Sequence, residues 1–328
     1  MKMTMTLTTY KLRLGTRGSL LARMQSQLVA DELQQAHPGL QVELLIIKTT
    51  GDSITDRPLH DIGGKGLFTK ELERALLDGQ IDFAVHSFKD VPVTMPLIDI
   101  SGLVIACTPR REDARDTLAV RLPTCEKTGP RPTSLSTLPI GIRVGTGSSR
   151  RRCQILRQRP DLIVEPIRGN IDTRLRKLAE GQYEAVVLAT AGLRRANLFN
   201  ATYMTPLEPT EILSAPGQGA LALQCRAQDA QTRHLLQSLH DSDTAVCVET
   251  ERELVNRLDG DCHSPIAALA EIRGETLHFK AVVGRRDGGL PVVSAQASGF
   301  RANASAVVDS IFSALSEAGV QALLRPIR

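Results

Sequence analysis

The feature that most constrains the fold of this chain is the alternation of strand-like and helix-like segments along its first two thirds. Short apolar runs, which predict strands, are separated by longer segments with helical periodicity. The first predicted strands are 11–15, 41–48 and 81–86, and the predicted helices between them are 19–36 and 67–77. This alternation is typical of α/β domains built on a mainly parallel sheet.

A second unit of the same kind follows a proline-rich stretch, 122–139, which we interpret as a surface insertion or linker. Its predicted strands are 140–144, 162–167 and 185–189. From about Asp243 the pattern changes to a helix, a loop around Cys262, alternating strands and a final helix over 302–324. This change predicts a smaller α+β domain at the end of the chain.

Composition excludes several classes of protein. The net charge of +4 over 328 residues and the low aromatic content, 3% with no Trp, argue against a nucleic-acid-binding protein. The six cysteines lack the spacing of a zinc site or a disulfide scaffold. No segment resembles a signal peptide or a membrane span, so we expect a cytoplasmic protein with reduced thiols.

Positive charge is concentrated in the second unit. Residues 140–195 contain twelve Arg and Lys against five Asp and Glu, an excess of seven in a chain of net charge +4. Arginines follow each predicted strand here: Arg150 to Arg152, then Arg168, then Arg194 and Arg195. Because ligands of open α/β sheets bind at the carboxyl ends of strands, and guanidinium groups pair well with carboxylates and phosphates, we predict an anion pocket. For the run of three arginines alone, a solvated surface is the alternative.

Other motifs have both a structural and a functional interpretation. His86-Ser-Phe-Lys89-Asp90 ends a predicted buried strand, and it is either a solvated ion pair or a catalytic carboxylate beside an ammonium group. The glycines around Lys65 and Thr146 lack the remaining residues of a nucleotide-binding loop, so we interpret them as turns. The irregular segment 49–66 is typical of a binding loop or lid.

Long segments in a preserved order carry a resemblance to a known family. They are Gly15-Thr-Arg17-Gly-Ser19-Leu-Leu-Ala22, Gly63-Gly-Lys-Gly-Leu-Phe-Thr-Lys-Glu-Leu72, Ala84-Val-His-Ser-Phe-Lys-Asp-Val-Pro92, Arg111-Glu-Asp-Ala-Arg-Asp116, Val144-Gly-Thr-Gly-Ser-Ser-Arg-Arg-Arg-Cys-Gln154, Ile167-Arg-Gly-Asn170, Thr173-Arg-Leu175, Ala191-Gly-Leu-Arg-Arg195, Pro216-Gly-Gln-Gly-Ala220 and the Cys262 loop. In these segments the chain resembles the hydroxymethylbilane synthase family, also called porphobilinogen deaminases.

The resemblance implies an α/β fold with two periplasmic-binding-protein-like (type II) lobes and a smaller α+β C-terminal domain. The first lobe would comprise 10–110 and 216–238. The second, arginine-rich lobe would comprise 111–210 with the insertion 122–139. The C-terminal domain, 240–328, would carry the cofactor cysteine.

The resemblance also implies a dipyrromethane cofactor, one per chain, joined to Cys262 by a thioether. Four porphobilinogen molecules would be added to it head to tail with loss of ammonia, and hydrolysis would release the linear tetrapyrrole hydroxymethylbilane. The implied protein is a monomer that binds neither nucleic acid nor membrane and hands its product to a tetrapyrrole-cyclising enzyme. The alternative function is a non-catalytic two-lobed binder of anionic solutes.

Matching positions assign roles to individual residues, and no metal is implied. Asp90 is the candidate that stabilises the azafulvene cation formed on loss of ammonia, with Lys89 beside it as a second catalytic residue. The positions matching cofactor contacts are Cys262, Arg17, Ser19, Lys89, Asp90, Thr146, Ser148, Arg150, Arg151, Arg168 and Gly169. Those matching substrate contacts are Arg17, Ser19, Arg168, Arg174 and Arg195. Because each pyrrole carries an acetate and a propionate, the growing chain needs cations around it.

The chain departs from the family pattern near the arginine run. The family commonly reads Thr-Ser-Ser-Leu-Arg-Arg where this chain has Thr146-Gly-Ser-Ser-Arg-Arg151. Gly147 therefore lacks a hydroxyl donor, and Arg152 is an additional cation without an assigned role. We interpret Cys153 as a packed residue without a chemical role.

Overall fold

The computed structural model describes residues 10–49, 69–93, 98, 102–121, 131–261 and 263–325. The chain divides into two compact units, Met1–Arg110 with Leu221–Ser242 and Arg111–Ala220 with Asp243–Arg328, and each is described by itself. Most of the predicted lid 49–66, half of the insertion 122–139, and Cys262 lie outside the described residues. The predicted domain boundaries stay predictions.

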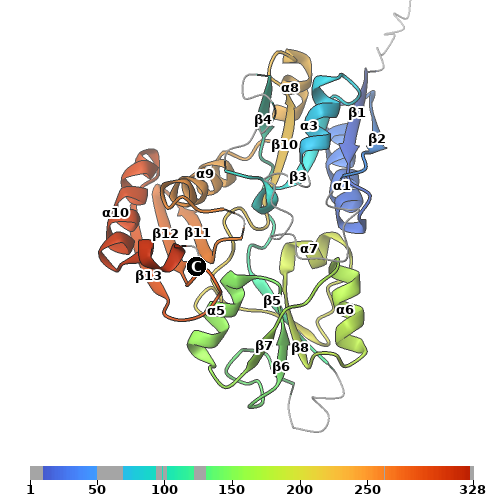
Figure 1. Ribbon diagram of the computed structural model, residues 1–328. Helices are drawn as coiled ribbons and strands as arrows, with labels where there is room; N and C mark the ends of the chain where they lie inside the picture. Colours follow the sequence, from blue (N-terminus) through green and yellow to red (C-terminus); the bar gives the residue numbers. More distant parts are fainter. Residues whose placement is uncertain are drawn as a thin grey trace, which may run out of the picture. The chain divides into compact units, whose positions relative to one another are not determined.

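The first unit is built on a five-stranded sheet with the order β2-β1-β3-β10-β4 (Figure 1). Its strands are β1 (Tyr10–Thr16), β2 (Leu40–Ile46), β3 (Phe83–Ser87), β4 (Leu103–Cys107) and β10 (Leu221–Arg226). β1 pairs in parallel with β2 and β3, whereas β10 is antiparallel to both of its neighbours. A late segment of the chain therefore supplies the single reversed strand of an otherwise parallel sheet.

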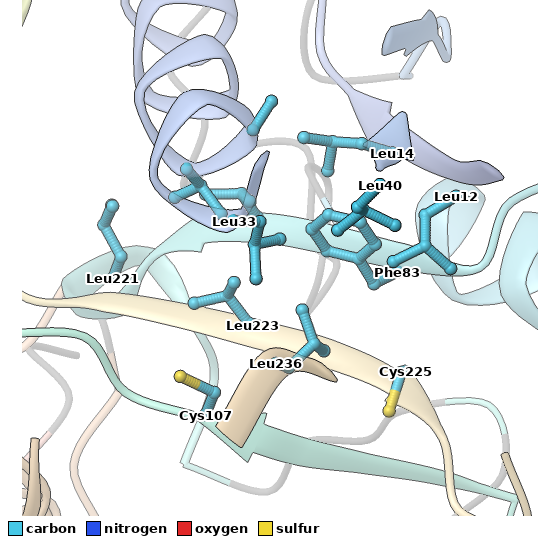
Figure 2. Close-up of a cluster of buried hydrophobic side chains, with 13 residues drawn as sticks. Leu12, Leu14, Leu33, Leu40, Phe83, Cys107, Leu221, Leu223, Cys225 and Leu236 are labelled. Atoms are coloured by element: carbon cyan, nitrogen blue, oxygen red, sulfur yellow. The ribbon is translucent and has the colours of Figure 1, made fainter. Parts of the chain in front are cut away.

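Helices cover both faces of this sheet. They are α1 (Leu20–Ala36), α3 (Lys70–Leu77) and α8 (Ala230–Gln237), and a 3₁₀ turn, η2 (Phe88–Asp90), follows β3. Figure 2 shows Leu33 of α1 and Leu236 of α8 in one apolar cluster with Phe83 and Leu223 of the strands. Leu72 and other residues of α3 pack in a separate cluster on the opposite face. Strand side chains alternate between the two faces of a sheet. Because helices cover both faces here, the strands must be apolar on both sides, which agrees with the continuous apolar runs from which the strands were predicted.

The second unit contains a sheet with the equivalent order, β7-β6-β8-β5-β9. Its strands are β5 (Asp116–Val120), β6 (Arg143–Gly145), β7 (Ile163–Glu165), β8 (Ala185–Ala189) and β9 (Met204–Pro206), and its helices are α5 (Ser149–Gln158), α6 (Ile171–Ala179) and α7 (Thr190–Arg195). Here β5 is the reversed strand between β8 and β9. α5 packs on one face through Ile155, and α6 and α7 pack on the other through Leu178 and Leu193.

The end of the chain forms a three-stranded antiparallel sheet, β11-β12-β13, within the same unit. Its elements are α9 (Ser242–Arg257), β11 (Ile266–Arg273), β12 (Thr276–Val283), β13 (Val293–Phe300), η3 (Arg301–Asn303), α10 (Ala304–Glu317) and α11 (Val320–Leu324). The predicted single helix over 302–324 is wrong in this respect, because Gly319 adopts a φ of +81° and separates α10 from α11. Leu213 packs with Ala267 and Leu269, which joins this sheet to the preceding lobe.

This architecture confirms the predicted fold class of two similar α/β lobes and a smaller α+β domain. Each lobe has four parallel strands and one reversed strand. The reversed strands, β5 and β10, come at or soon after the points where the chain passes from one unit to the other, at Arg111 and Leu221. Within the described parts of the chain, no helix is long and apolar enough to span a membrane.

Candidate functional site: a buried arginine cluster and a cofactor loop

The turn between β6 and α5 places the start of the helix. The Thr146 amide donates to the Glu165 carbonyl (2.9 Å), which fixes the turn to β7, and Thr146 Oγ1 accepts from the Ser148 amide (3.3 Å). Ser148 caps the helix, because its Oγ accepts from the Arg151 amide (3.4 Å). A Cβ on Gly147 would lie 3.0 Å from the Ile167 carbonyl oxygen. This crowding gives a physical reason for glycine where the family pattern has serine.

Arg150 and Arg151 share one carboxylate inside the second unit. Arg150 Nη2 lies 2.8 Å from Asp116 Oδ2, and Arg151 donates to Asp116 Oδ1 from Nε (3.1 Å) and Nη2 (2.7 Å). Their other contacts are backbone carbonyls, at 2.5 Å from Arg150 Nη1 to Leu213 and 2.9 Å from Arg151 Nη1 to Val187. Arg150, Arg151 and Asp116 are 4%, 5% and 0% exposed. The two arginines are therefore held by the protein's own groups, and we name these three residues the buried arginine cluster.

The charges of this cluster do not balance. Burial would raise the pKa of Asp116, but the attraction of Arg150 and Arg151 outweighs it and holds that pKa well below its usual range. Burial lowers the pKa of Arg150, and the repulsion of Arg151 adds to this against the attraction of Asp116. Arginine nevertheless stays protonated in proteins. Among the residues that the structure describes, no second carboxylate pairs with either guanidinium, so one positive charge is in excess.

The excess charge lies in the first turn of α5, where the helix dipole is also positive. An uncompensated buried cation is costly, and a bound anion removes much of that cost. The cluster therefore fits a carboxylate-bearing cofactor. Direct contact of Arg150 or Arg151 with such a cofactor stays a prediction.

Asp116 is a functional candidate that sequence reasoning missed. Gln218 Nε2 also donates to Asp116 Oδ1 (2.9 Å) and to the Ala114 carbonyl (2.7 Å), which ties the cluster to the segment before β10. The available signal was the matched segment 111–116, in which Asp116 is the last residue.

The predicted residues after β7 lie in a different environment. Arg168 and Gly169 are exposed, and Gly169 has a φ of +108°. A Cβ there would lie 2.5 Å from the Thr173 side chain, so only glycine fits this turn. The Gly169 carbonyl accepts from Arg174 Nε (2.8 Å), which orients the Arg174 side chain along the turn.

The arginines of α7 have different partners. Arg194 pairs with Glu112 (2.9 Å) and Asp113 (3.3 Å) and lies over the ring of Phe199. Arg195 is half-buried, and its Nη2 donates to the Gly219 carbonyl (2.9 Å). Of the two, Arg195 is the predicted ligand contact, and Arg194 is engaged by acidic side chains.

Four predicted site residues belong to the first unit. Ser19 caps α1, since its Oγ accepts from the Ala22 amide (3.3 Å). Gly15 of β1 pairs with Ala84 of β3, so Arg17, directly after β1, lies near the end of β3. Burial lowers the pKa of His86 in β3 to about 4, and the charge of Arg17 adds to this effect. Lys89 is half-exposed and Asp90 is exposed in η2. This unit thus brings Arg17 near the strand that precedes Lys89 and Asp90.

The residues flanking Cys262 are ordered by hydrogen bonds. Asp261 Oδ1 accepts from the His263 amide (2.9 Å) and from Ser264 Oγ (2.9 Å). Burial would raise the pKa of Asp261, but these bonds and the attraction of Arg286 outweigh it and lower that pKa. No group of side chains among the described residues is suited to hold a metal ion.

Arg152 and Cys153 have structural surroundings. Arg152 Nη1 donates to the Val164 carbonyl of β7 (2.9 Å), which gives this additional cation a position. Cys153 is buried, its Sγ donates to the Arg150 carbonyl (3.2 Å), and burial raises the pKa of the thiol to about 11. The interpretation of Cys153 as a packed residue agrees with these contacts.

The chain is similar in sequence to known proteins over most of its length. Residues 12–234 match the family model described as porphobilinogen deaminase, dipyromethane cofactor binding domain, and residues 245–310 match that of the porphobilinogen deaminase C-terminal domain. A porphobilinogen deaminase of Syntrophotalea carbinolica is 46% identical over 88% of this chain and 90% of its own length. One of Listeria monocytogenes is 42% identical over 97% of this chain and 98% of its own length. The effector binding domain of BenM with benzoate covers 70% of this chain and 90% of that domain, at 16% identity and a TM-score of 0.39.

Two lobes of equal topology and a buried arginine cluster with an excess positive charge define a class of two-lobed proteins that bind an anionic group. Within that class, the chain belongs to the porphobilinogen deaminase family. The predicted family is confirmed, and so is the dipyrromethane cofactor, because the matched family model is that of its binding domain.

Proposed function

We propose that this chain is a hydroxymethylbilane synthase. It condenses four porphobilinogen molecules head to tail on a dipyrromethane attached to Cys262, releases ammonia at each addition, and frees the linear tetrapyrrole by hydrolysis. The observation that supports this most strongly is the buried arginine cluster with its excess charge, in a chain whose relatives are porphobilinogen deaminases. A non-catalytic binder of anionic solutes is not favoured by those relatives.

The cofactor supplies the pyrrole ring to which the first substrate is joined. The chain's own residues supply cations for the carboxylates of the rings. Arg168 is exposed at the carboxyl end of β7, and Arg174 and Arg195 are oriented by backbone carbonyls. Guanidinium groups bind carboxylates in a fixed geometry, so these three can orient successive rings.

Asp90 is proposed to assist the loss of ammonia. The aminomethyl group is protonated, so when its carbon–nitrogen bond breaks the electron pair leaves with ammonia, and the positive charge left on carbon is shared with the pyrrole ring. A fixed carboxylate stabilises such a charge as it develops. Asp90 is exposed, while Phe88 and Val91 on either side of it are buried and hold the turn in place.

Further expectations stay predictions: a monomer, a cytoplasmic location, the absence of nucleic-acid and membrane binding, and transfer of the product to a tetrapyrrole-cyclising enzyme. Porphobilinogen as the substrate follows from the family.

The role of Asp90 is tested with Asp90→Asn. We expect the turnover of porphobilinogen, measured as ammonia released, to fall about a hundred- to a thousand-fold, since one preorganised charge-stabilising group is lost. The urea midpoint should not change, because Asp90 is exposed. Asp78→Asn alters another exposed carboxylate of the same unit and should keep its activity. Turnover of Asp90→Asn close to that of the unaltered protein would remove Asp90 from the mechanism.

A further inference from the structure

The loop that carries Cys262 is closed by its own side chains. The Asp261 amide donates to Ser264 Oγ (3.0 Å), and Asp261 Oδ1 accepts from both the Ser264 hydroxyl and the His263 amide. These bonds fix the two flanks of Cys262 relative to each other. They do not fix the loop relative to the rest of the unit.

The first attachment of this loop is to the start of α5. Ser149 Oγ donates to the carbonyl of His263 at 2.8 Å. Ser149 is the first residue of α5, directly between the capping residue Ser148 and Arg150 of the buried arginine cluster. The flank of the cofactor cysteine is therefore bonded to the helical turn that carries the excess positive charge.

The second attachment comes from the turn between β12 and β13. Arg286 Nη2 forms an ion pair with Asp261 Oδ2 at 2.8 Å. The Arg286 amide donates to the Leu323 carbonyl (3.0 Å), which holds the turn to α11.

This turn also packs directly on α5, so the three segments contact one another in pairs. A Cβ on Gly288, which has a φ of +74°, would lie 3.1 Å from Ser149 Cα and 3.0 Å from Arg152 Cδ. A Cβ on Gly284 would lie 2.6 Å from Cys153 Sγ. The small glycines allow the turn and the helix to approach this closely.

Ser149 is also a departure from the family pattern given above. In Thr-Ser-Ser-Leu-Arg-Arg the fourth position is leucine, whose side chain has no hydrogen-bond donor. The bond to His263 thus depends on a residue that this chain has in place of that leucine.

We propose that Ser149 and Arg286 are positioning residues for the cofactor. They hold the flanks of Cys262 against the start of α5. A cofactor attached to the cysteine can then place its carboxylates at the start of that helix without a further movement of the loop. This inference rests on the proposed function, since it needs a cofactor at Cys262.

The test measures how fast the cofactor is acquired. The full chain is produced in cells that make no porphobilinogen and is then incubated with porphobilinogen, and the fraction with added mass is followed by intact-mass spectrometry. We expect Ser149→Ala and Arg286→Gln each to load about three- to tenfold more slowly, since one hydrogen bond or partly exposed ion pair is lost. The double variant should be slower than either.

The matched controls remove the same kinds of contact at positions that form neither attachment of the Cys262 loop. Ser310→Ala removes a serine that also donates to a carbonyl, that of Ala306 (3.0 Å), and Arg285→Gln removes an arginine of the same turn that pairs with Asp287 (3.0 Å). Both should load at the rate of the unaltered protein. Ser149→Thr keeps a hydroxyl and should restore loading relative to Ser149→Ala.

The outcomes separate this inference from the proposed function. If the unaltered chain never gains mass, the proposed function fails. If it loads and both single variants load equally fast, the positioning role is wrong. The role is also wrong if the cofactor-free variants load slowly and melt at a lower temperature, and Ser149→Thr does not restore the loading rate. Slow loading would then reflect a loss of stability.

Discussion

Two strand ends of one sheet carry arginines in opposite environments. After β6, Arg150 and Arg151 are buried and paired with Asp116, whereas after β7, Arg168 is exposed. Both were predicted to bind carboxylates, on the same argument from strand ends. The difference shows that an arginine at such an edge is either buried among the protein's own groups or left accessible to a ligand.

Energetics explains why the two kinds of arginine need different surroundings. A buried guanidinium must have a fixed partner, and removal of that partner leaves an uncompensated charge. An exposed guanidinium remains hydrated until a ligand arrives, so its loss affects binding more than folding.

The largest expected effect is the loss of stability in Asp116→Asn, which tests the buried side of this comparison. The change leaves two buried cations without a carboxylate, so the free energy of unfolding should fall by about 3–5 kcal/mol. Urea unfolding followed by circular dichroism measures this change.

Two variants control for the chemistry of this substitution. Asp161→Asn removes a carboxylate from an ion pair with Arg159 in the same unit, which is more exposed, and should change stability little. Arg151→Leu leaves one cation with one carboxylate and should cost less stability than Asp116→Asn. A loss below about 1 kcal/mol for Asp116→Asn would mean that the cluster does not hold the site together.

A smaller effect is expected for Arg168→Gln, on substrate binding and not on stability. The exposed side chain contributes little to folding, so the free energy of unfolding should stay within about 0.5 kcal/mol. The loss of a charge-assisted contact with a substrate carboxylate should raise the KM for porphobilinogen about tenfold. Steady-state kinetics measures the KM, and urea unfolding measures the stability.

Arg176→Gln is the matched control, because Arg176 is an exposed arginine of α6 that pairs with Glu180. Its KM should be that of the unaltered protein. An unchanged KM for Arg168→Gln, or a large loss of stability, would place Arg168 in the same role as the buried pair.

The smallest effect is a difference in acid stability. Because the pKa of Asp116 is depressed in the folded state, the unfolded state binds a proton first as the pH falls, and this stabilisation is lost below about pH 4. Asp116→Asn should therefore show a shallower loss between pH 5 and about 3 than Arg168→Gln. Urea midpoints over that range measure it, and equal slopes would contradict the pairing of Asp116.

His86 acts in a separate window of pH. Its pKa is lowered to about 4 by burial, below the value of an unfolded histidine, so the unfolded state binds the proton first. The stabilisation from neutral His86 is thus lost as the pH falls from about 6.5 to about 4, before Asp116 contributes.

Much of the fold could be predicted from local patterns. β8 extends over the predicted 185–189, and α1 covers most of the predicted helix 19–36. The reversed strand β5 was not predicted from its pattern, since a short apolar run that begins with aspartate gives little signal. The break at Gly319 was missed because one glycine is tolerated in many helices.

Less of the site could be predicted, because its main contact is not local. Asp116 is 35 residues from Arg151, and no periodicity links a carboxylate that begins one strand to a helix after another. Likewise, the bond from Ser149 to His263 joins residues 114 positions apart. Sequence reasoning could point to the cations and, through the family resemblance, to Cys262 as the candidate cofactor cysteine, but tertiary packing decides which cations are buried.

The most direct test of the account is the intact mass of the purified chain beside that of Cys262→Ser. We predict that the unaltered protein is heavier than its polypeptide by one covalent dipyrromethane, and that Cys262→Ser has the bare polypeptide mass and no turnover of porphobilinogen. A bare mass for the unaltered protein, together with full activity of Cys262→Ser, would contradict the account.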